Sequence, residues 1–180
     1  MCNDIISELE QDNSRLVKES IIEREVLAKN DEFFAGCKLA LDPLITFGVK
    51  QVPIREVRQA IGYDWYDFLD LCNKLSLRQL TGHNARDAII EAMTDCDTDE
   101  WNNWYRRILI KDLKCGVSEK TINKVCKKNN ATDYMIPVFS CMLAHDSANH
   151  EKKLVGKKML DYKLDGVRVL AVYNKDIDSL

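Results

Sequence analysis

Apolar residues recur every three or four positions in one segment after another up to about residue 130, and this periodicity constrains the fold more than any other feature. The spacing is typical of amphipathic helices that bury one face in a shared core. Ser14 and Ser118 each precede such a segment, and serine is a favoured residue at helix starts. We therefore predict an all-α domain. Its helices are expected near residues 14–30, 31–42, 53–61, 65–71, 84–93, 101–114 and 119–127.

The pattern changes in the last third of the chain. Between about residues 127 and 158 the period is lost and polar residues dominate, which indicates a linker and the irregular start of a second domain. Two β-prone runs follow, residues 159–164 and 167–173, and the Asp-Gly pair between them is a hairpin signal. The pattern predicts a mainly α chain, with an all-α domain followed by the β-containing start of a second domain. The two predicted domains span residues 1–130 and 131–180.

Charge is distributed unevenly although the net charge is only −3. Residues 1–32 carry nine acidic and four basic residues, whereas residues 103–130 carry eight basic and two acidic ones. The basic residues repeat along two predicted helices that flank Gly116 and Ser118, and the free N–H groups at a helix start attract phosphate. We interpret this stretch as a contact for the phosphates of duplex DNA, made without sequence preference. On these residues alone, a solvated charged face on a helical bundle is the alternative.

The seven cysteines and the short apolar runs exclude several classes of protein. No two cysteines stand at the C-x-x-C spacing of a zinc site, so we expect no metal bound by cysteine. An odd number of cysteines without a secretion signal favours reduced thiols in the cytoplasm. No apolar run reaches the roughly 18 residues of a membrane-spanning helix, so no membrane partner is expected.

Residues 163–168, Lys-Leu-Asp-Gly-Val-Arg, include a candidate nucleophile. A lysine beside a tight Asp-Gly turn is held on a rigid β scaffold. Neighbouring cations, a metal ion or desolvation can lower the pKa that otherwise keeps its amine protonated. Gly166 permits close approach of a bulky ligand, and the guanidinium of Arg168 matches phosphate oxygens. A surface hairpin with a solvated lysine is the alternative on these six residues alone.

The hexapeptide matches K-x-D-G-x-R, a signature that ATP-dependent DNA ligases share with RNA ligases and mRNA capping enzymes. The resemblance implies that Lys163 attacks the α-phosphate of ATP and then carries AMP. It also implies that Asp161 helps to hold the adenine and that Arg168 contacts the nucleotide. ATP and Mg²⁺ are the cofactors that the resemblance implies.

A second signature separates these families. Residues 109–125 resemble the long motif of the helical DNA-binding domain in DNA ligases, and Leu80-Thr81-Gly82 resembles its L-T-G-N turn. His83 stands where the family carries asparagine, a departure that a backbone contact to phosphate would survive. With both signatures, the chain resembles the N-terminal part of ATP-dependent DNA ligases from T-even-like bacteriophages. The DNA contacts expected on this basis are Thr81, Gly82, Arg107, Lys111, Gly116, Ser118, Lys120 and Lys124.

The resemblance implies a DNA-binding domain followed by the truncated start of an α/β, ATP-grasp-like nucleotidyl-transferase domain. The implied parent enzyme is a monomer that seals nicks in duplex DNA. Its implied location is the cytoplasm, which is the host cytoplasm if the protein is viral. Lys163 takes AMP from ATP, AMP passes to the 5′-phosphate at the nick, and the 3′-hydroxyl then displaces AMP. Only 17 residues follow Lys163, so we expect later motifs of the family to be missing and the chain to be an inactive fragment. The alternatives are a non-enzymatic DNA-binding fragment and an RNA ligase or capping-type transferase.

Overall fold

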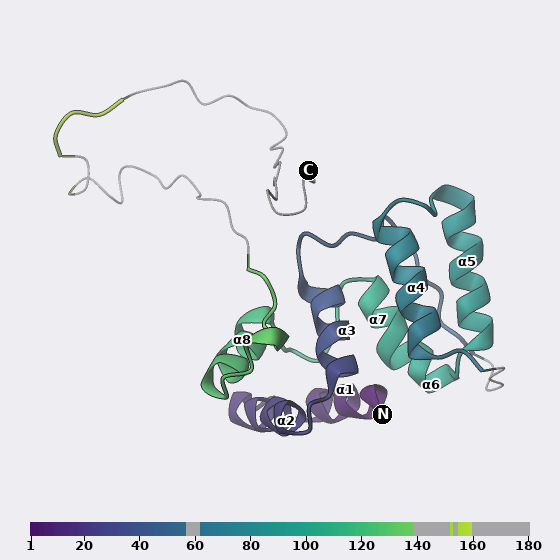
Figure 1. Cartoon of the computed structure of the whole chain (residues 1–180), viewed down its shortest axis with the longest axis horizontal. Coiled ribbons are helices and arrows are strands. Elements are labelled where there is room, and N and C mark those ends of the chain that lie inside the picture. The colour runs from purple at the N-terminus through teal and green to yellow at the C-terminus, as the bar shows by residue number, and fades with distance from the viewer. Residues whose placement is uncertain (57–61, 139–151, 153–154, 160–180) are drawn as a thin grey trace. The chain divides into compact units, whose positions relative to one another are not determined.

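The structure, a computed structural model, describes residues 1–56, 62–138, 152 and 155–159 (Figure 1). The chain divides into two compact units, Met1–Ser140 and Cys141–Leu180, and we call the first the helical unit. Its described elements are α1 (Cys2–Gln11), α2 (Arg15–Leu27), α3 (Asp31–Leu41), α4 (Trp65–Ser76), α5 (Gly82–Asp95), α6 (Thr98–Glu100), the π-helical turn η1 (Trp101–Tyr105), α7 (Arg106–Leu109), α8 (Glu119–Lys128) and the 3-10 turn η2 (Thr132–Tyr134).

Side-chain caps fix the starts of several helices. The Asn30 side chain accepts a hydrogen bond from the Phe33 amide at the start of α3. At the start of α4, the Asp64 carboxylate accepts from the Tyr66 and Asp67 amides, while the Asp67 carboxylate accepts from the Asp64 amide. Caps of this kind satisfy N–H groups that have no partner within the helix.

The continuous helical run α6–η1–α7 supplies the centre of the core. Five of its side chains are at most 1% exposed: Trp101, Trp104, Tyr105, Ile108 and Leu109. The Trp104 ring stacks against Phe33 of α3 and Trp65 of α4, at centroid distances of 6.1 and 6.2 Å. Gly36 of α3 also packs against Trp104, because a Cβ at Gly36 would lie 2.2 Å from an atom of that ring. A side chain at position 36 would therefore force α3 away from the core.

Most of the predicted helices are confirmed. Helices begin directly after Ser14 and Ser118, and the structure is mainly α, with no strand among the described residues. Helix α1 was not predicted; it buries Cys2, Ile5, Ile6 and Leu9. None of the described helices combines the length and apolar character needed to cross a membrane.

The helix predicted from residue 53 is wrong over residues 53–56, which are not helical. Here the backbone bonds side chains from η1. The Pro53 oxygen accepts from Trp101 Nε1 at 3.0 Å, and the Arg55 backbone exchanges two hydrogen bonds with the Asn102 amide group. These distant contacts override the local apolar period, and the rest of that predicted helix, residues 57–61, lies outside the described residues.

Of the predicted β-hairpin, residues 159–173, all but Met159 lie outside the described residues, as does most of the predicted α/β domain, residues 131–180. The domain boundary predicted near residue 130 stays a prediction. Just after it, and still within the helical unit, η2 packs on α3 and α8, and the Tyr134 ring stacks on Phe34 at 4.3 Å between centroids. The Asn123 side chain donates to the Ile136 oxygen and accepts from the Ile136 amide, which holds this segment against α8.

Candidate nucleic-acid interface

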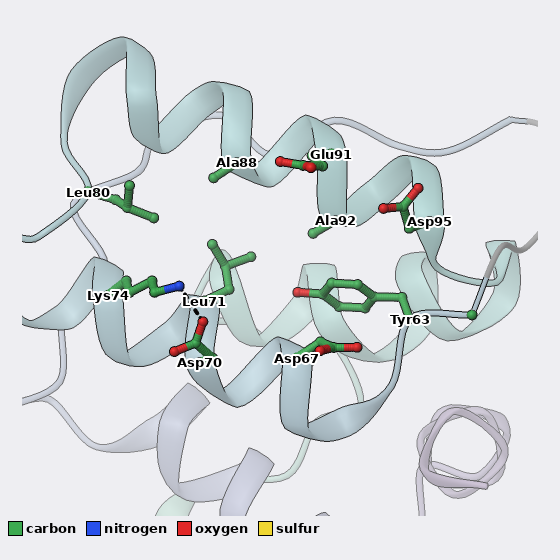
Figure 2. Close-up of a pocket in the computed structure, with 11 residues that line it drawn as sticks. Tyr63, Asp67, Asp70, Leu71, Lys74, Leu80, Ala88, Glu91, Ala92 and Asp95 are labelled. Carbon is green, nitrogen blue, oxygen red and sulfur yellow. Dashed lines mark ion pairs between the residues drawn. The ribbon is translucent and has the colours of Figure 1, made fainter.

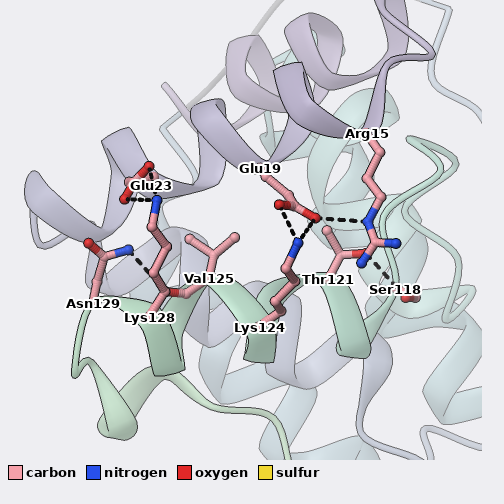
Figure 3. Close-up of polar contacts among 9 residues, drawn as sticks. All are labelled: Arg15, Glu19, Glu23, Ser118, Thr121, Lys124, Val125, Lys128 and Asn129. Atoms are coloured by element: carbon pink, nitrogen blue, oxygen red, sulfur yellow. Dashed lines mark hydrogen bonds and ion pairs between the residues drawn. The ribbon is translucent and has the colours of Figure 1, made fainter.

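Helices α2 and α8 lie side by side and run in the same direction (Figure 3). Lys124 of α8 pairs with Glu19 of α2 at 2.7 Å, and Lys128 pairs with Glu23 at 3.1 Å. Each step of four residues along one helix matches a step of four along the other. The two helix N-termini therefore lie at the same end of the pair, and their positive dipole ends act on the same space.

The loop between α7 and α8 folds back sharply before the start of α8. Lys111, Lys114 and Gly116 all have backbone φ angles in the left-handed region, at 61°, 54° and 65°. The Asp112 carboxylate accepts a hydrogen bond from the Lys114 amide at 2.9 Å, which stabilises one of these turns. At Gly116 a Cβ would lie 2.7 Å from Lys18 Nζ, so space as well as backbone conformation favours glycine there.

Three cationic side chains bond carbonyl oxygens of this loop or of the end of α3. Arg107 donates to the Leu113 oxygen at 2.9 Å and also pairs with Glu10, while the buried Lys18 donates to the Cys115 oxygen at 2.7 Å. Lys111 donates to the oxygens of Leu39 and Asp42, both at 2.7 Å. Burial lowers the pKa of Lys111. These cations fix the backbone that leads into α8.

A pocket of about 320 Å³ opens at the shared end of α2 and α8. Among the described residues, three cations and no carboxylate line it, although Arg15 Nε pairs at 2.8 Å with Glu19, which does not line the pocket. Ser118 is the N-cap of α8, yet its side chain makes no capping bond; its hydroxyl lies 3.5 Å from that of Thr121. The pocket thus combines cations, hydroxyls and helix N-termini, the groups that bind phosphate oxygens. Its lining residues are Asn13, Arg15, Lys18, Gly116, Ser118, Lys120 and Thr121.

One cation of α8, Lys120, lines this pocket, which we call the phosphate pocket. Farther along the helix, Lys124 and Lys128 are paired with the two glutamates of α2, so the acidic N-terminal stretch offsets much of the basic one. Hydrogen bonds and charges from Lys124 and Arg15 hold the pKa of Glu19 below its usual value. Lys120, in contrast, is exposed and makes no ion pair within the described part of the chain.

A second pocket, about 350 Å³ between α4 and α5, suits phosphate poorly (Figure 2). Four carboxylates line it, and its one lysine, Lys74, is paired with Asp70 at 2.5 Å. Like charges would repel a phosphate group from this pocket. Its carboxylates belong to Asp67, Asp70, Glu91 and Asp95.

The structure brings together three of the residues predicted to contact DNA: Gly116, Ser118 and Lys120 line the phosphate pocket. Lys124 lies one helical turn beyond Lys120 and shares its charge with Glu19.

Two other predicted contacts, Arg107 and Lys111, direct their cationic groups to carbonyl oxygens inside the helical unit. Thr81 and Gly82 stand apart at the exposed start of α5, where the Gly82 φ angle of 57° favours glycine. The predicted nucleotide-binding and catalytic residues, Asp161, Lys163 and Arg168, lie outside the described residues.

The part of the phosphate pocket at the start of α2 could not be predicted from the sequence. Asn13, Arg15 and Lys18 come from the acidic N-terminal stretch, which did not suggest an anion site. The serine before α2 signalled a helix start, but nothing in the sequence showed that this start lies beside that of α8. Thr121 was missed because its hydroxyl becomes relevant only next to Ser118.

Comparison with known proteins places the chain beside ligase-related structures. No protein-family model matches the chain. No curated protein matches it either. Two solved structures, named Pmar-Lig_PreS3 and Pmar-Lig_Pre, are each 56% identical in sequence over 87% of this chain, with a TM-score of 0.78. The chain spans 36% of the length of each. Over most of its length, the chain therefore has the fold of part of these ligase-related structures.

Proposed function

We propose that this chain is the DNA-gripping portion, with the start of the adenylating portion, of an ATP-dependent DNA ligase of the T-even-like bacteriophage type. The observation that carries the proposal is the phosphate pocket, in which two helix N-termini meet Arg15, Lys18 and Lys120. The likeness to ligase-related structures supports the ligase class. The Lys163 hexapeptide supports the reaction type.

In the proposed complex, a phosphate of nicked duplex DNA enters the phosphate pocket. Its oxygens accept hydrogen bonds from the Ser118 and Thr121 hydroxyls and from the first amides of α8. Arg15 and Lys120 supply charge and release counterions from the DNA. Contacts of this kind position the duplex without reading its bases, which suits an enzyme that must act at nicks in any sequence.

For the chemistry, we propose that Lys163 acts on ATP, with Asp161 holding the adenine and Arg168 contacting the nucleotide. The deprotonated Lys163 amine attacks the α-phosphorus, an N–P bond forms, and pyrophosphate leaves with the electrons of the broken P–O bond. AMP then passes to the 5′-phosphate, and the 3′-hydroxyl displaces it to seal the strand. Mg²⁺ would neutralise the phosphate charges. Among the described residues, no cluster of His, Cys, Asp and Glu could hold a metal ion, so we assign Mg²⁺ no residue.

The proposed grip is tested by Lys120→Glu. This change places an acidic group in the phosphate pocket, and we expect it to weaken binding of a labelled nicked duplex about tenfold or more at low salt, as read by fluorescence anisotropy. Lys38→Glu is the matched control, because Lys38 is exposed on α3, does not line the pocket, and the net charge changes equally. Equal effects of the two changes would show that only net charge matters and would refute the assigned site.

A further inference from the structure

A groove of about 650 Å³ lies between α5, α7 and the segment before residue 54, and it shares no residue with the phosphate pocket. Six of its described lining residues are apolar and three are cationic, and none of them carries a carboxylate. Its apolar lining residues are Val52, Pro53, Ile89, Ile90, Met93 and Ile110. Its polar lining residues are Lys50, Gln51, Arg86 and Arg106.

Hydrogen bonds fix the walls of this groove in the free chain. Arg106 Nε donates to the Val52 oxygen at 3.0 Å, and Trp101 Nε1 donates to the Pro53 oxygen at 3.0 Å, which ties the extended wall to the helical run. Arg55 Nη1 donates to the Met93 oxygen, which ties the same wall to α5. A preformed groove costs a ligand little ordering of the protein.

Both parts of the lining remain open to a ligand. Ile90 is 37% exposed and Pro53 is exposed, so apolar surface reaches solvent. Lys50, Arg86 and Arg106 make no ion pair within the described part of the chain, and Lys50 and Arg86 are exposed. An occupant that complements both features carries large apolar side chains flanked by carboxylates.

We propose that this groove docks an acidic, amphipathic peptide segment of a partner protein. Its apolar side chains would cover Ile90 and Met93, and its carboxylates would meet Arg86, Lys50 and Arg106. A groove of this size holds a few apolar side chains, as grooves that bind amphipathic helices do. A DNA backbone complements it less well, because sugar-phosphate has no large apolar group to fill the floor. The inference adds a protein partner to the proposed DNA ligase and does not depend on the phosphate pocket.

The test is a selection from a random peptide library on the full chain, with counter-selection on an Arg86→Glu, Ile90→Asp double variant. We expect the enriched peptides to combine Asp or Glu with Leu, Ile, Phe or Trp. The strongest enriched peptide, made synthetically and labelled, should bind the parent chain and lose about tenfold or more affinity with either single change. Leu77→Asp is the matched control, because Leu77 is 69% exposed and lies outside the groove. Circular dichroism shows whether each variant keeps the parent fold.

Several results would overturn the proposal. One is the absence of peptides enriched over the double variant, and another is enrichment of basic or uncharged peptides. A third is affinity that survives both Arg86→Glu and Ile90→Asp. If these changes weaken binding of duplex DNA as strongly as binding of the peptide, the groove binds nucleic acid. If they abolish self-association of the chain, the groove binds a second copy of the chain. The groove and the phosphate pocket are shown to act separately if Arg86→Glu or Ile90→Asp abolishes peptide binding while Lys120→Glu still weakens DNA binding.

Discussion

Glu100 is a half-buried carboxyl group between two side-chain donors at the edge of the aromatic core. The Tyr105 hydroxyl donates to its Oε1 at 3.1 Å, and the Cys96 thiol lies 3.8 Å from its Oε2. Burial raises the pKa of Glu100, and the nearby charges of Glu32 and Asp97 act in the same direction. Loss of the Glu100 proton is therefore harder in the folded chain than in the unfolded one.

This shift predicts a pH dependence of stability. Between the ordinary pKa of 4.5 and the raised pKa of the folded state, Glu100 keeps its proton in the folded chain and loses it in the unfolded chain. As pH rises through this range, Glu100 therefore lowers the free energy of unfolding. Glutamine cannot titrate, and its oxygen can still accept from Tyr105. We expect the free energy of unfolding of Glu100→Gln, relative to the parent, to increase from pH 4 to pH 7 in urea titrations. The exposed Glu91→Gln is the control, and a difference that stays constant with pH would contradict the prediction.

The roles of individual cations were predicted less well than the helices that contain them. Arg107 and Lys111 stand four residues apart, which predicts a basic stripe on a helix surface. In the structure Arg107 bonds the Leu113 oxygen of the folded-back loop and Glu10, whereas Lys111 bonds carbonyl oxygens at the end of α3, where the helix leaves them without amide partners. Glu10 lies 97 residues from Arg107 in sequence, and Leu39 lies 72 residues from Lys111. Such pairings do not appear in any local pattern.

At the level of elements, helix starts were predictable and helix pairings were not. Ser14 and Ser118 are local signals, whereas the parallel packing of α2 on α8 depends on contacts between residues 105 positions apart. The wrong prediction at Pro53 has the same origin, since Pro53 bonds Trp101, 48 residues away, and Arg55 bonds Asn102, 47 residues away. The phosphate pocket arises from such a pairing, so the sequence identified only its α8 half.

The loop before α8 depends on Lys18, and this dependence can be measured. Lys18→Met keeps most of the side chain but leaves the buried Cys115 oxygen without its donor. We expect a loss of about 1–3 kcal/mol in the free energy of unfolding, measured by urea titration. We also expect weaker DNA binding, because Gly116 and Ser118 follow this carbonyl directly. Lys38→Met, a change at an exposed position, should alter neither quantity. A Lys18→Met variant as stable as the parent chain would show that the bond from Lys18 to the Cys115 oxygen does not hold the loop.

At the scale of the whole molecule, the proposed reaction requires that Lys163 become covalently attached to AMP. A chimera that joins this chain to the parts of the matched ligase-related structures that it does not span should, with ATP and Mg²⁺, gain one AMP on Lys163 by peptide mass spectrometry. Lys163→Ala should abolish the adduct, and Lys157→Ala should not. An adduct that persists in Lys163→Ala would show that another residue is the nucleophile.

The proposed contact between DNA and the phosphate pocket is tested by the salt dependence of DNA binding by the whole chain. Arg15→Gln and Lys120→Gln together remove two cations from the phosphate pocket without adding negative charge. If both neutralise phosphates, the slope of log K against log salt concentration should become shallower by about 1.8 for a nicked duplex, since each lost contact removes about 0.9. A double variant with the slope and affinity of the parent chain would contradict the account, because DNA would then be held elsewhere.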